Sequence, residues 1–280
     1  MCKNLSPQYL AVMVLILVAL ACQTATPDPT LTPIPTYTFV PISSANPWPE
    51  EITDPKGATM RLVPAGTFTM GSENGASEEQ PIHEVYLDSY YMDAYEVANA
   101  LYKACAEAGV CDPPEHTDRF DNPKYANHPV IWVDWHMAKT YCEWRGAQLP
   151  TEAQWEKAAR GTDGRTYPWG ERIDCEKANY FDCNKVDTAP VGSYESGKSP
   201  YGIYDLAGNV WEWVADWYST TYYQVSPLEN PLGPGSGQFR VQRGGAWNRD
   251  GYNVRSAYRY ASDPALSSDV AGFRCSRSLP

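Results

Sequence analysis

The stretch that decides the fold runs from Tyr201 to Trp213 and reads YGIYDLAGNVWEW. Its first half contains Gly208 among short residues, a composition typical of a bent loop rather than of a helix. Its second half opens a tryptophan-rich run that continues to Trp217. Because large aromatic side chains anchor the cores of small domains, we interpret Trp211, Trp213 and Trp217 as core residues.

Most of the regular secondary structure is expected in the part of the chain before this stretch. Alternating apolar and polar residues predict strands over Met60–Met70 and Glu84–Met92. Helical spacing predicts helices over Tyr95–Ala108 and Trp135–Trp144. A capping box of Thr151 and Gln154 predicts a third helix, which runs through Arg160 and is stopped by Gly161. Glycine and proline interrupt most of the remaining chain, so the pattern indicates a loop-rich α+β domain with low regular secondary structure.

Composition narrows the class of protein. The 22 Lys and Arg residues against 34 Asp and Glu residues give a net charge of −12 and a pI near 4.8. This balance excludes a protein that binds nucleic acid through its charge. A hydrophobic content of 43% is too high for a disordered chain, so one globular domain with a tail is expected.

The N-terminal residues resemble an export signal. Residues 1–21 combine the positive Lys3 with an apolar run, Tyr9–Ala21, that is too short to span a membrane comfortably. The run ends in Ala-Leu-Ala before Cys22, which resembles a bacterial lipobox. In such a signal Cys22 is acylated and becomes the new N-terminus. Ordinary secretion or a retained anchor stays open as the alternative.

Residues 22–49 are rich in Thr and Pro and predict an extended tether between the lipid and the domain at residues 50–280. A strand near Tyr37–Pro41 is the alternative for part of this segment. The expected location is therefore the bacterial cell surface or the outer face of the cytoplasmic membrane, with contact to the membrane through the lipid anchor alone.

Cysteine usage fits an oxidising compartment. Of 8 cysteines, Cys2 leaves with the signal and Cys22 carries lipid. The remaining set is even: Cys105, Cys111, Cys142, Cys175, Cys183 and Cys275. The two close pairs are natural local bridges, which leaves Cys142 and Cys275 to close a long loop. Metal binding by these thiols is the alternative, but no C-x-x-C occurs and the four histidines are scattered.

Seven runs together resemble the formylglycine-generating enzyme family, also called sulfatase-modifying factors. They cover about Ala58 to Arg277 in order and read VPAGTFTMGS (63–72), PVIWVDW (129–135), QLPTEAQWE (148–156), YPWG (167–170), YGIYDLAGNVWEW (201–213), RGGAW (243–247) and GFRC (272–275). The resemblance implies a single domain with a variant of the C-type lectin-like fold. It also implies a bridge between Cys142 and Cys275, as the spacing argument does.

The resemblance implies a chemistry that this sequence does not support. The family oxidises a cysteine of a sulfatase to formylglycine with oxygen and Cu(I), which is held by two protein thiolates because soft ligands suit that ion. The pair lies between the RGG and GFR runs, and here the interval Ala246–Arg274 contains no cysteine. The serine that active members carry after RGG is replaced by Ala246. We therefore expect no catalytic residue and no copper.

Calcium is the cofactor that the resemblance favours. The resemblance implies a structural Ca²⁺ held by Asp205, Glu212 and the carbonyls of Gly208 and Val210. Ca²⁺ prefers hard oxygen ligands, and carboxylates and backbone carbonyls are both of this kind. A second Ca²⁺ site is expected at Asn179 and Tyr180, with Asp182 or Asp187 as its unresolved acidic partner. The alternative is that the carboxylates only cap turns and face water.

The family's substrate groove corresponds here to a set rich in residue types that binding sites favour: Trp211, Trp247, Asn248, Arg249, Tyr258 and Arg259. We therefore expect a non-catalytic recognition or accessory module for an extracellular peptide, protein or glycan. The alternative is an oxidoreductase of the same family that modifies a protein substrate with altered chemistry. No H-E-x-x-H motif and no Gly-rich phosphate loop point to another enzyme class.

Overall fold

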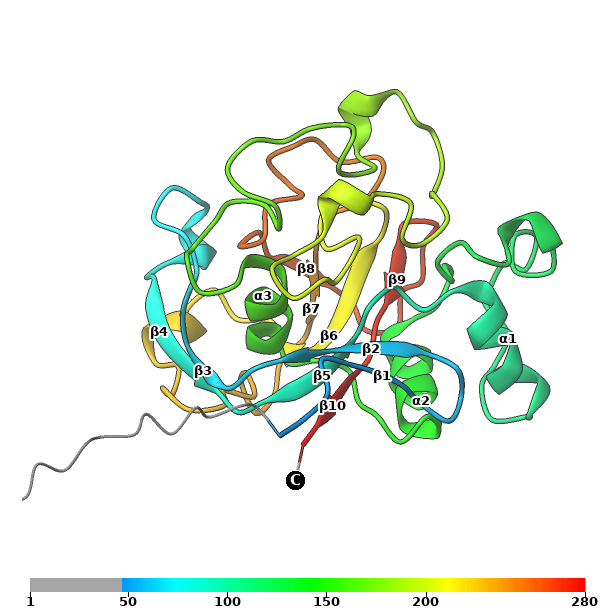
Figure 1. Ribbon diagram of the computed structural model, residues 1–280, viewed down its shortest axis with the longest axis horizontal. Coiled ribbons are helices and arrows are strands. Elements are labelled where there is room, and N and C mark those ends of the chain that lie inside the picture. Colours follow the sequence, from blue (N-terminus) through cyan, green and yellow to red (C-terminus); the bar gives the residue numbers. More distant parts are fainter. Residues whose placement is uncertain (1–46, 280) are drawn as a thin grey trace, which may run out of the picture. The chain divides into compact units, whose positions relative to one another are not determined.

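Three β-sheets and three α-helices make up the regular structure of residues 47–279, the part of the chain that the computed structural model describes (Figure 1). The expected signal at 1–21, the acylated Cys22 and nearly all of the tether lie outside these residues. The helices are α1 (Asn99–Glu107), α2 (Trp135–Trp144) and α3 (Glu152–Arg160). Short 3₁₀ turns lie at Ser77–Glu79, Pro123–Tyr125, Phe181–Cys183, Glu195–Gly197 and Tyr222–Gln224. Among residues 47–279 no helix is long and apolar enough to cross a membrane.

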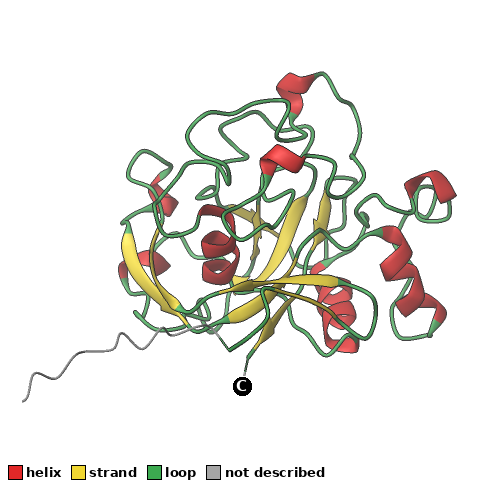
Figure 2. Cartoon of the chain, in the orientation of Figure 1, coloured by secondary structure: helices red, strands yellow, loops and turns green. Residues whose placement is uncertain are grey.

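The sheets join parts of the chain that are far apart in sequence. The first sheet is antiparallel and contains, in spatial order, β1 (Glu51–Thr53), β2 (Thr59–Val63), β5 (Tyr90–Asp93) and β10 (Ser276–Ser278). The second is a hairpin of β3 (Gly66–Met70) and β4 (His83–Leu87). The third contains β8 (Tyr260–Ser262), β7 (Arg240–Arg243), β6 (Trp211–Trp217) and β9 (Ala271–Phe273), with β6 and β9 parallel. Loops connect most of these elements (Figure 2), so the expected loop-rich α+β class is confirmed.

The two strands predicted at Met60–Met70 and Glu84–Met92 are each two strands, so both predictions were wrong in extent. β2 pairs with β5, whereas β3 pairs with β4 in another sheet. The break in the first stretch is at Pro64, whose nitrogen carries no hydrogen and cannot continue a ladder. The next residue, Ala65, donates its N–H to the Ser89 hydroxyl at 2.8 Å. The chain therefore passes from one sheet to the other at Pro64–Ala65 in the first stretch and near Ser89 in the second. The alternation of apolar and polar residues continues through both of these points.

The helix predictions hold, with one change of boundary. α2 has its predicted bounds, and α3 begins after the N-cap Thr151 with the capping box to Gln154. α1 begins at Asn99 rather than at Tyr95. The reason is that Val97 lies extended, donating to the Phe273 carbonyl at 2.9 Å and accepting from the Val130 N–H at 2.8 Å.

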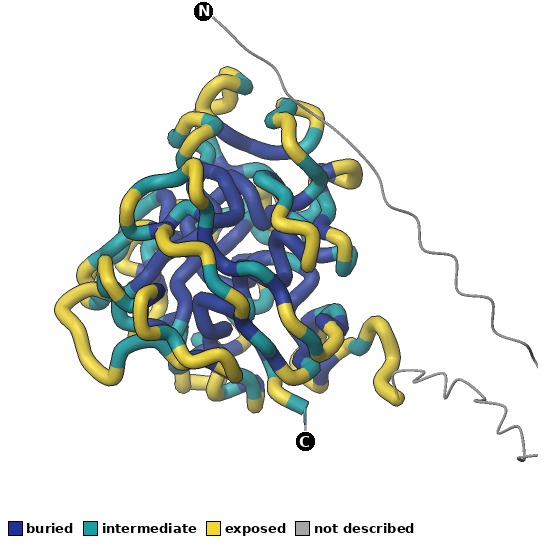
Figure 3. Tube along the Cα trace, turned by 90° about the vertical axis from the view of Figure 1, so that its left-hand side faces the viewer, coloured by how far each residue is buried: buried dark blue, intermediate teal, exposed yellow. Residues whose placement is uncertain are grey.

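Two of the three tryptophans that the sequence marked lie in buried hydrophobic clusters. Trp213 is fully buried beside Tyr102, Tyr141 and Phe273, and Trp211 is buried in a smaller cluster. Trp217 is only half-buried, and its ring carries the Arg240 guanidinium, whose carbon lies 3.5 Å from the ring centroid. Figure 3 shows the buried segments inside and the exposed loops around them. The core interpretation is thus right for two of the three tryptophans.

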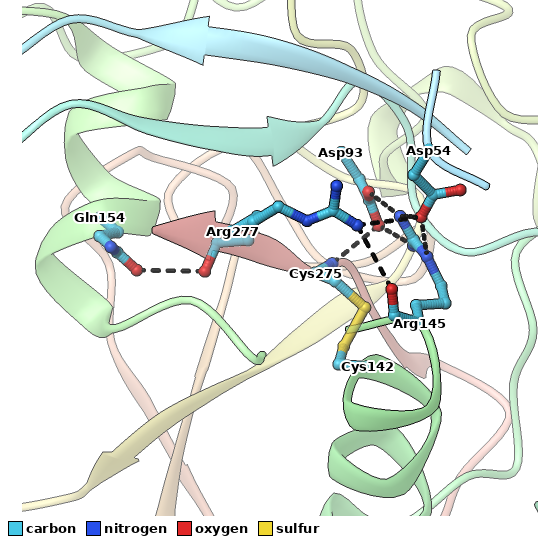
Figure 4. Close-up of a disulfide and its surroundings, with 8 residues drawn as sticks. Asp54, Asp93, Cys142, Arg145, Gln154, Cys275 and Arg277 are labelled. Atoms are coloured by element: carbon cyan, nitrogen blue, oxygen red, sulfur yellow. Dashed lines mark hydrogen bonds and ion pairs between the residues drawn. A yellow bond between two sulfur atoms is a disulfide. The ribbon is translucent and has the colours of Figure 1, made fainter. Parts of the chain in front are cut away.

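All three predicted disulfides form: Cys105–Cys111, Cys142–Cys275 and Cys175–Cys183. Cys142–Cys275 joins α2 to the segment that leads into β10 (Figure 4). Beside it Arg145 donates two hydrogen bonds to Asp93, at 2.7 and 2.8 Å, and one to Asp54 at 2.8 Å. A covalent bond and a buried ion cluster therefore fix α2 to the first sheet together.

Candidate functional site

Three buried carboxylates and one guanidinium lie together where the loop before β6 meets the segment before α1. The carboxylates belong to Glu96, Asp205 and Glu212, and the guanidinium belongs to Arg274. The sequence predicted Asp205 and Glu212 as metal ligands but missed Glu96. A lone glutamate in an otherwise apolar approach to a helix was the available signal.

Each carboxylate of this acidic cluster has a different partner. Glu212 accepts two hydrogen bonds from Arg274, both 2.7 Å long, and one from the Trp155 indole at 2.8 Å. Asp205 accepts from the Gly192 N–H at 2.6 Å. Glu96 accepts from the Asn209 side-chain amide at 2.6 Å and from the Val210 N–H at 3.3 Å. Only Glu212 is neutralised by a direct ion pair.

The electrostatics of the acidic cluster are unbalanced. Burial, together with the negative charges of Asp205 and Glu212, raises the pKa of Glu96 well above its usual value. Burial also raises the pKa of Asp205 to about 6. With all three carboxylates ionised against one guanidinium the cluster would carry −3 + 1 = −2, and the raised pKa of Glu96 favours its protonated form, which lowers this negative charge. Within residues 47–279 no three or more His, Cys, Asp or Glu side chains converge as metal ligands, so a cation here would need the loop carbonyls as well.

The second predicted metal segment lies directly beside the first. Asn179 forms a parallel bridge with Gly208, and the Asn209 N–H donates to the Asn179 carbonyl at 2.8 Å. Gly208 has a φ of +81°, and a Cβ there would lie 2.2 Å from that carbonyl oxygen, so the close approach requires glycine. The structure therefore brings the loops at 179–180 and 208–210 together.

The donors of this second segment are partly engaged. The Asn179 amide nitrogen donates to the Asp187 carbonyl at 2.9 Å, but its side-chain oxygen is buried without a hydrogen-bond partner. The Tyr180 carbonyl accepts from the Cys183 N–H at 3.1 Å. The Asp187 carboxylate accepts from the Tyr125 hydroxyl at 2.8 Å and pairs with Arg119. An orphaned buried oxygen is the kind of donor that a cation satisfies.

The predicted aromatic groove is assembled in part. Trp211 packs with Ala246 and Val270, and Trp247 and Tyr258 lie against this cluster. The Trp247 N–H donates to the Asn209 carbonyl at 2.9 Å, so the loop that carries the acidic cluster also positions Trp247. We call the region of Trp211, Trp247 and Tyr258 the aromatic groove.

Several polar atoms of the aromatic groove are buried without a hydrogen-bond partner. They are the indole nitrogens of Trp211 and Trp247, the side-chain oxygen of Asn248 and the Nε of Arg249. The Arg249 carbonyl accepts from the Phe181 N–H at 2.9 Å, which ties this segment to the loop of the Cys175–Cys183 disulfide. Buried polar atoms are normally paired, so these four are a local exception that ordered water or a ligand would satisfy.

Arg259 does not face the aromatic groove. Its guanidinium is buried and donates two hydrogen bonds to Glu152, at 2.7 and 2.8 Å. Its neighbours Tyr258 and Tyr260 lie instead against Trp211, with ring centroids 5.8 and 5.1 Å away. The alternation of side chains along an extended segment could have separated the arginine from the two tyrosines.

The interval Ala246–Arg274, where the resemblance places the copper-binding thiols, contains no cysteine. The six cysteines of residues 47–279 all form disulfides. Ala246 is fully buried beside Trp211. The groove therefore offers aromatic faces, amide groups and an arginine rather than soft metal ligands.

The fold and the site define a loop-rich domain of the C-type lectin-like type in which a cluster of aromatic side chains lies beside a buried acidic cluster. A sequence model described as "Sulfatase-modifying factor enzyme 1-like domain" matches residues 47–279, so the chain belongs to this family. The structure is similar to that of PvdO from Pseudomonas aeruginosa, with a TM-score of 0.70 and 27% identity over 82% of this chain and 98% of that one. The resemblance drawn from the seven sequence runs is thereby confirmed.

Two relatives bear different names. The formylglycine-generating enzyme of Streptomyces coelicolor is 34% identical over 84% of this chain and 94% of its own length. The serine/threonine-protein kinase pkn1 of Chlamydia caviae is 36% identical over 79% of this chain. The match spans only 38% of that kinase's length. The shared part is therefore a domain that occurs both alone and within a longer protein.

Proposed function

We propose that this protein is a lipid-anchored extracellular recognition module that binds a peptide or a glycan in the aromatic groove and does not oxidise thiols. The observation that carries the proposal is the pairing of all six domain cysteines in disulfides. A disulfide sulfur is neither a nucleophilic thiolate nor a Cu(I) ligand of the kind that the family's reaction requires.

The groove's chemistry supports a binding role. The unpaired polar atoms of Trp211, Trp247, Asn248 and Arg249 each carry a desolvation cost. A ligand that accepts from the indoles and the guanidinium and donates to the amide recovers that cost, about 1–3 kcal/mol for each neutral group. Extended peptides and glycans both offer alternating donors and acceptors of this kind.

A structural Ca²⁺ is part of the proposal. With its three carboxylates ionised, the acidic cluster would have a formal charge of −2, which one divalent cation would neutralise. Asp205, Glu212 and the carbonyls of Gly208 and Val210 would hold it, and the orphaned oxygen of Asn179 fits a second ion with the Tyr180 carbonyl. Such ions would link loops that form few β-sheet hydrogen bonds of their own. Through Asn209 they would also hold Trp247 in place.

The location completes the proposal. Acylation of Cys22 would tether the domain, and the Thr/Pro-rich residues 22–49 would space it from the lipid surface. Three disulfides in the domain are consistent with an oxidising compartment.

A copper titration tests the lost reaction. The full domain is titrated with Cu(I) in the presence of a Cys-x-Pro-x-Arg peptide, and the peptide is examined by mass spectrometry for conversion of its cysteine to formylglycine. We expect no stoichiometric copper binding and no mass change. The formylglycine-generating enzyme of Streptomyces coelicolor serves as the positive control. Stoichiometric Cu(I) binding or oxidised peptide would contradict the proposal.

The second candidate is an oxidoreductase that modifies a protein substrate with altered active-site chemistry. The observation in its favour is the match over 94% of the Streptomyces coelicolor enzyme, which leaves little of that protein unaccounted for. The same titration separates the two candidates, because copper binding or peptide oxidation is expected only from the oxidoreductase.

A further inference from the structure

A polar cavity of about 560 Å³ lies beside the aromatic groove and is not part of it. Its lining includes residues of the loop that follows β3, residues of the loop that follows α3, and Tyr252. Tyr252 packs edge-on to Tyr258 of the groove, with ring centroids 5.7 Å apart. The volume is within the range of about 300–1,000 Å³ that small-molecule sites occupy.

One wall of the cavity is fixed by Arg160, the last residue of α3. Its guanidinium donates to the Gly71 carbonyl of one loop and to the Gly164 carbonyl of the other, both at 2.5 Å. Glu156 pairs with Arg160 at 2.9 Å and accepts from the Gly71 N–H at 2.8 Å. Because these groups are buried, the two loops are held without help from a ligand, and a preformed site loses less entropy on binding.

The opposite wall presents a fixed aromatic ring. Arg255 donates two hydrogen bonds to the buried Glu79, at 2.7 and 2.8 Å. Its guanidinium carbon lies 4.0 Å from the centroid of the Tyr252 ring. The arginine thus backs the ring, while Tyr252 keeps 47% of its surface exposed. A ligand ring can stack on this surface without first ordering the tyrosine.

The lining of the cavity also contains polar side chains that form no hydrogen bonds within the protein. In the part of the chain that the structure describes, the side chains of Ser72, Asn74 and Thr162 form no hydrogen bonds. The Nε of Arg160 is buried and also lacks an acceptor. Hydroxyl and amide groups both donate and accept, so the cavity offers mixed hydrogen bonding beside an aromatic face.

The charges of the lining disfavour an anionic ligand. Arg160 and Arg255 are neutralised by Glu156 and Glu79, so an anion finds no free cation. Of the acidic lining residues, Asp163 pairs with Arg165 at 2.6 Å, and Glu171 accepts from the Thr166 hydroxyl at 2.6 Å. Glu73 also lines the cavity, and its carboxylate can accept hydrogen bonds from the hydroxyls of a ligand. An apolar ligand would leave the polar lining unpaired.

We propose that this cavity binds a neutral pyranose sugar whose ring stacks on Tyr252. Its hydroxyls pair with the side chains of Ser72, Asn74 and Thr162. The inference does not depend on whether the neighbouring groove is catalytic, because it rests on other residues. A peptide is a poorer fit, since its side chains do not present hydroxyls around a ring that can stack on the tyrosine.

Saturation-transfer NMR with sugar probes tests the proposal. The full domain is mixed in turn with methyl glycosides of glucose, galactose, mannose and N-acetylglucosamine. We expect saturation transfer to the ring protons of at least one glycoside. Tyr252→Ala should weaken that binding at least tenfold by removing the stacking surface. Thr162→Val, which keeps the shape and removes one hydroxyl, should weaken it several-fold.

The matched control is Phe239→Ala, which removes another partly exposed aromatic ring away from the cavity and should leave the signal unchanged. Loss of the signal in Tyr260→Ala with retention in Tyr252→Ala would place the sugar on Trp211 and overturn the proposal. Absence of saturation transfer to all four glycosides would also overturn it. Thermal melting of each variant identifies unfolding, and Thr162→Val keeps the test valid should Tyr252→Ala not fold.

Discussion

Asp216 makes the stability of the domain depend on pH. It lies on β6 in the third sheet, is 3% exposed, and accepts from the Glu152 backbone N–H at 2.7 Å. Burial and the Glu152 carboxylate raise its pKa to about 7, while Arg243 and Arg259 act in the opposite direction. The unfolded chain releases this proton near the ordinary value of 3.8. Between these values only the folded protein holds the proton, so stability falls as pH rises through the window.

Asp216→Asn removes this dependence because the amide has no charge to bury. We expect the melting temperature of the variant, relative to the natural protein, to rise between pH 5 and pH 8 by several degrees, since 1 kcal/mol corresponds to about 2–4 °C at this chain length. Differential scanning calorimetry at four pH values measures it. Asp118→Asn, at an exposed aspartate, is the control. A difference that does not change with pH would contradict the role of Asp216.

Individual site residues were predictable where a short motif carried them. Asp205, Gly208 and Glu212 occur within eight residues, so the local sequence brings their donors together without knowledge of the fold. Glu96 joins them from more than 100 residues away, and the third sheet and α1 have to form before its position is defined. Arg259 was misplaced for the opposite reason, because its neighbours in sequence face Trp211 while its own side chain turns inward to Glu152.

Among the secondary-structure elements, α2 depends on its covalent link. The Cys142–Cys275 bridge spans 133 residues, whereas Cys105–Cys111 spans 6. The chain-entropy model gives about 5 kcal/mol for the long closure and about 2 kcal/mol for the short one. We therefore expect the double change of Cys142 and Cys275 to serine to lower the melting temperature more than the same change of Cys105 and Cys111.

Calorimetry of both double variants under non-reducing conditions measures the difference. The comparison is matched because each bridge is buried and each variant replaces two sulfurs by two hydroxyls. Equal losses would show that burial of the new hydroxyls, rather than loop closure, decides the effect.

The elements also show which structural features the sequence pattern predicts and which it does not. The caps of α3 are local chemistry, so Thr151, Gln154 and Gly161 fix its ends in the sequence as they do in the structure. The strands near Pro64 and Ser89 change partner without a change in their alternating pattern. Alternation states which face of a strand is buried but not which sheet the strand joins.

The whole molecule combines a strongly acidic surface with an internal acidic cluster. A net charge of −12 disfavours further unpaired negative charge in the interior, yet Glu96, Asp205 and Glu212 meet only Arg274. The loops at 179–180 and 208–210 converge on this place with Trp247, so one ion there would link segments from three regions of the chain. The proposed Ca²⁺ would thus stabilise the entire domain.

Chelation tests this claim. We expect EDTA to lower the melting temperature by several degrees and Ca²⁺ to restore it, because a ligand at about 1,000 times its Kd adds about 4 kcal/mol to the free energy of unfolding. Mg²⁺ should not restore it, since that smaller ion demands octahedral geometry that flexible loop carbonyls do not supply. Tryptophan fluorescence should change in parallel, because the Asn209 carbonyl that holds Trp247 lies in the same loop.

Asp205→Asn sharpens the test. Asparagine tolerates the left-handed backbone at this position, where φ is +57°, and it keeps an oxygen for the Gly192 N–H but removes one negative charge. A higher Ca²⁺ concentration should then be required to restore the melting temperature, whereas Asp118→Asn should leave that requirement unchanged. Indifference of the natural protein to EDTA would mean that Arg274 and the surrounding amides stabilise the carboxylates alone. The loops would in that case need no ion to hold Trp247.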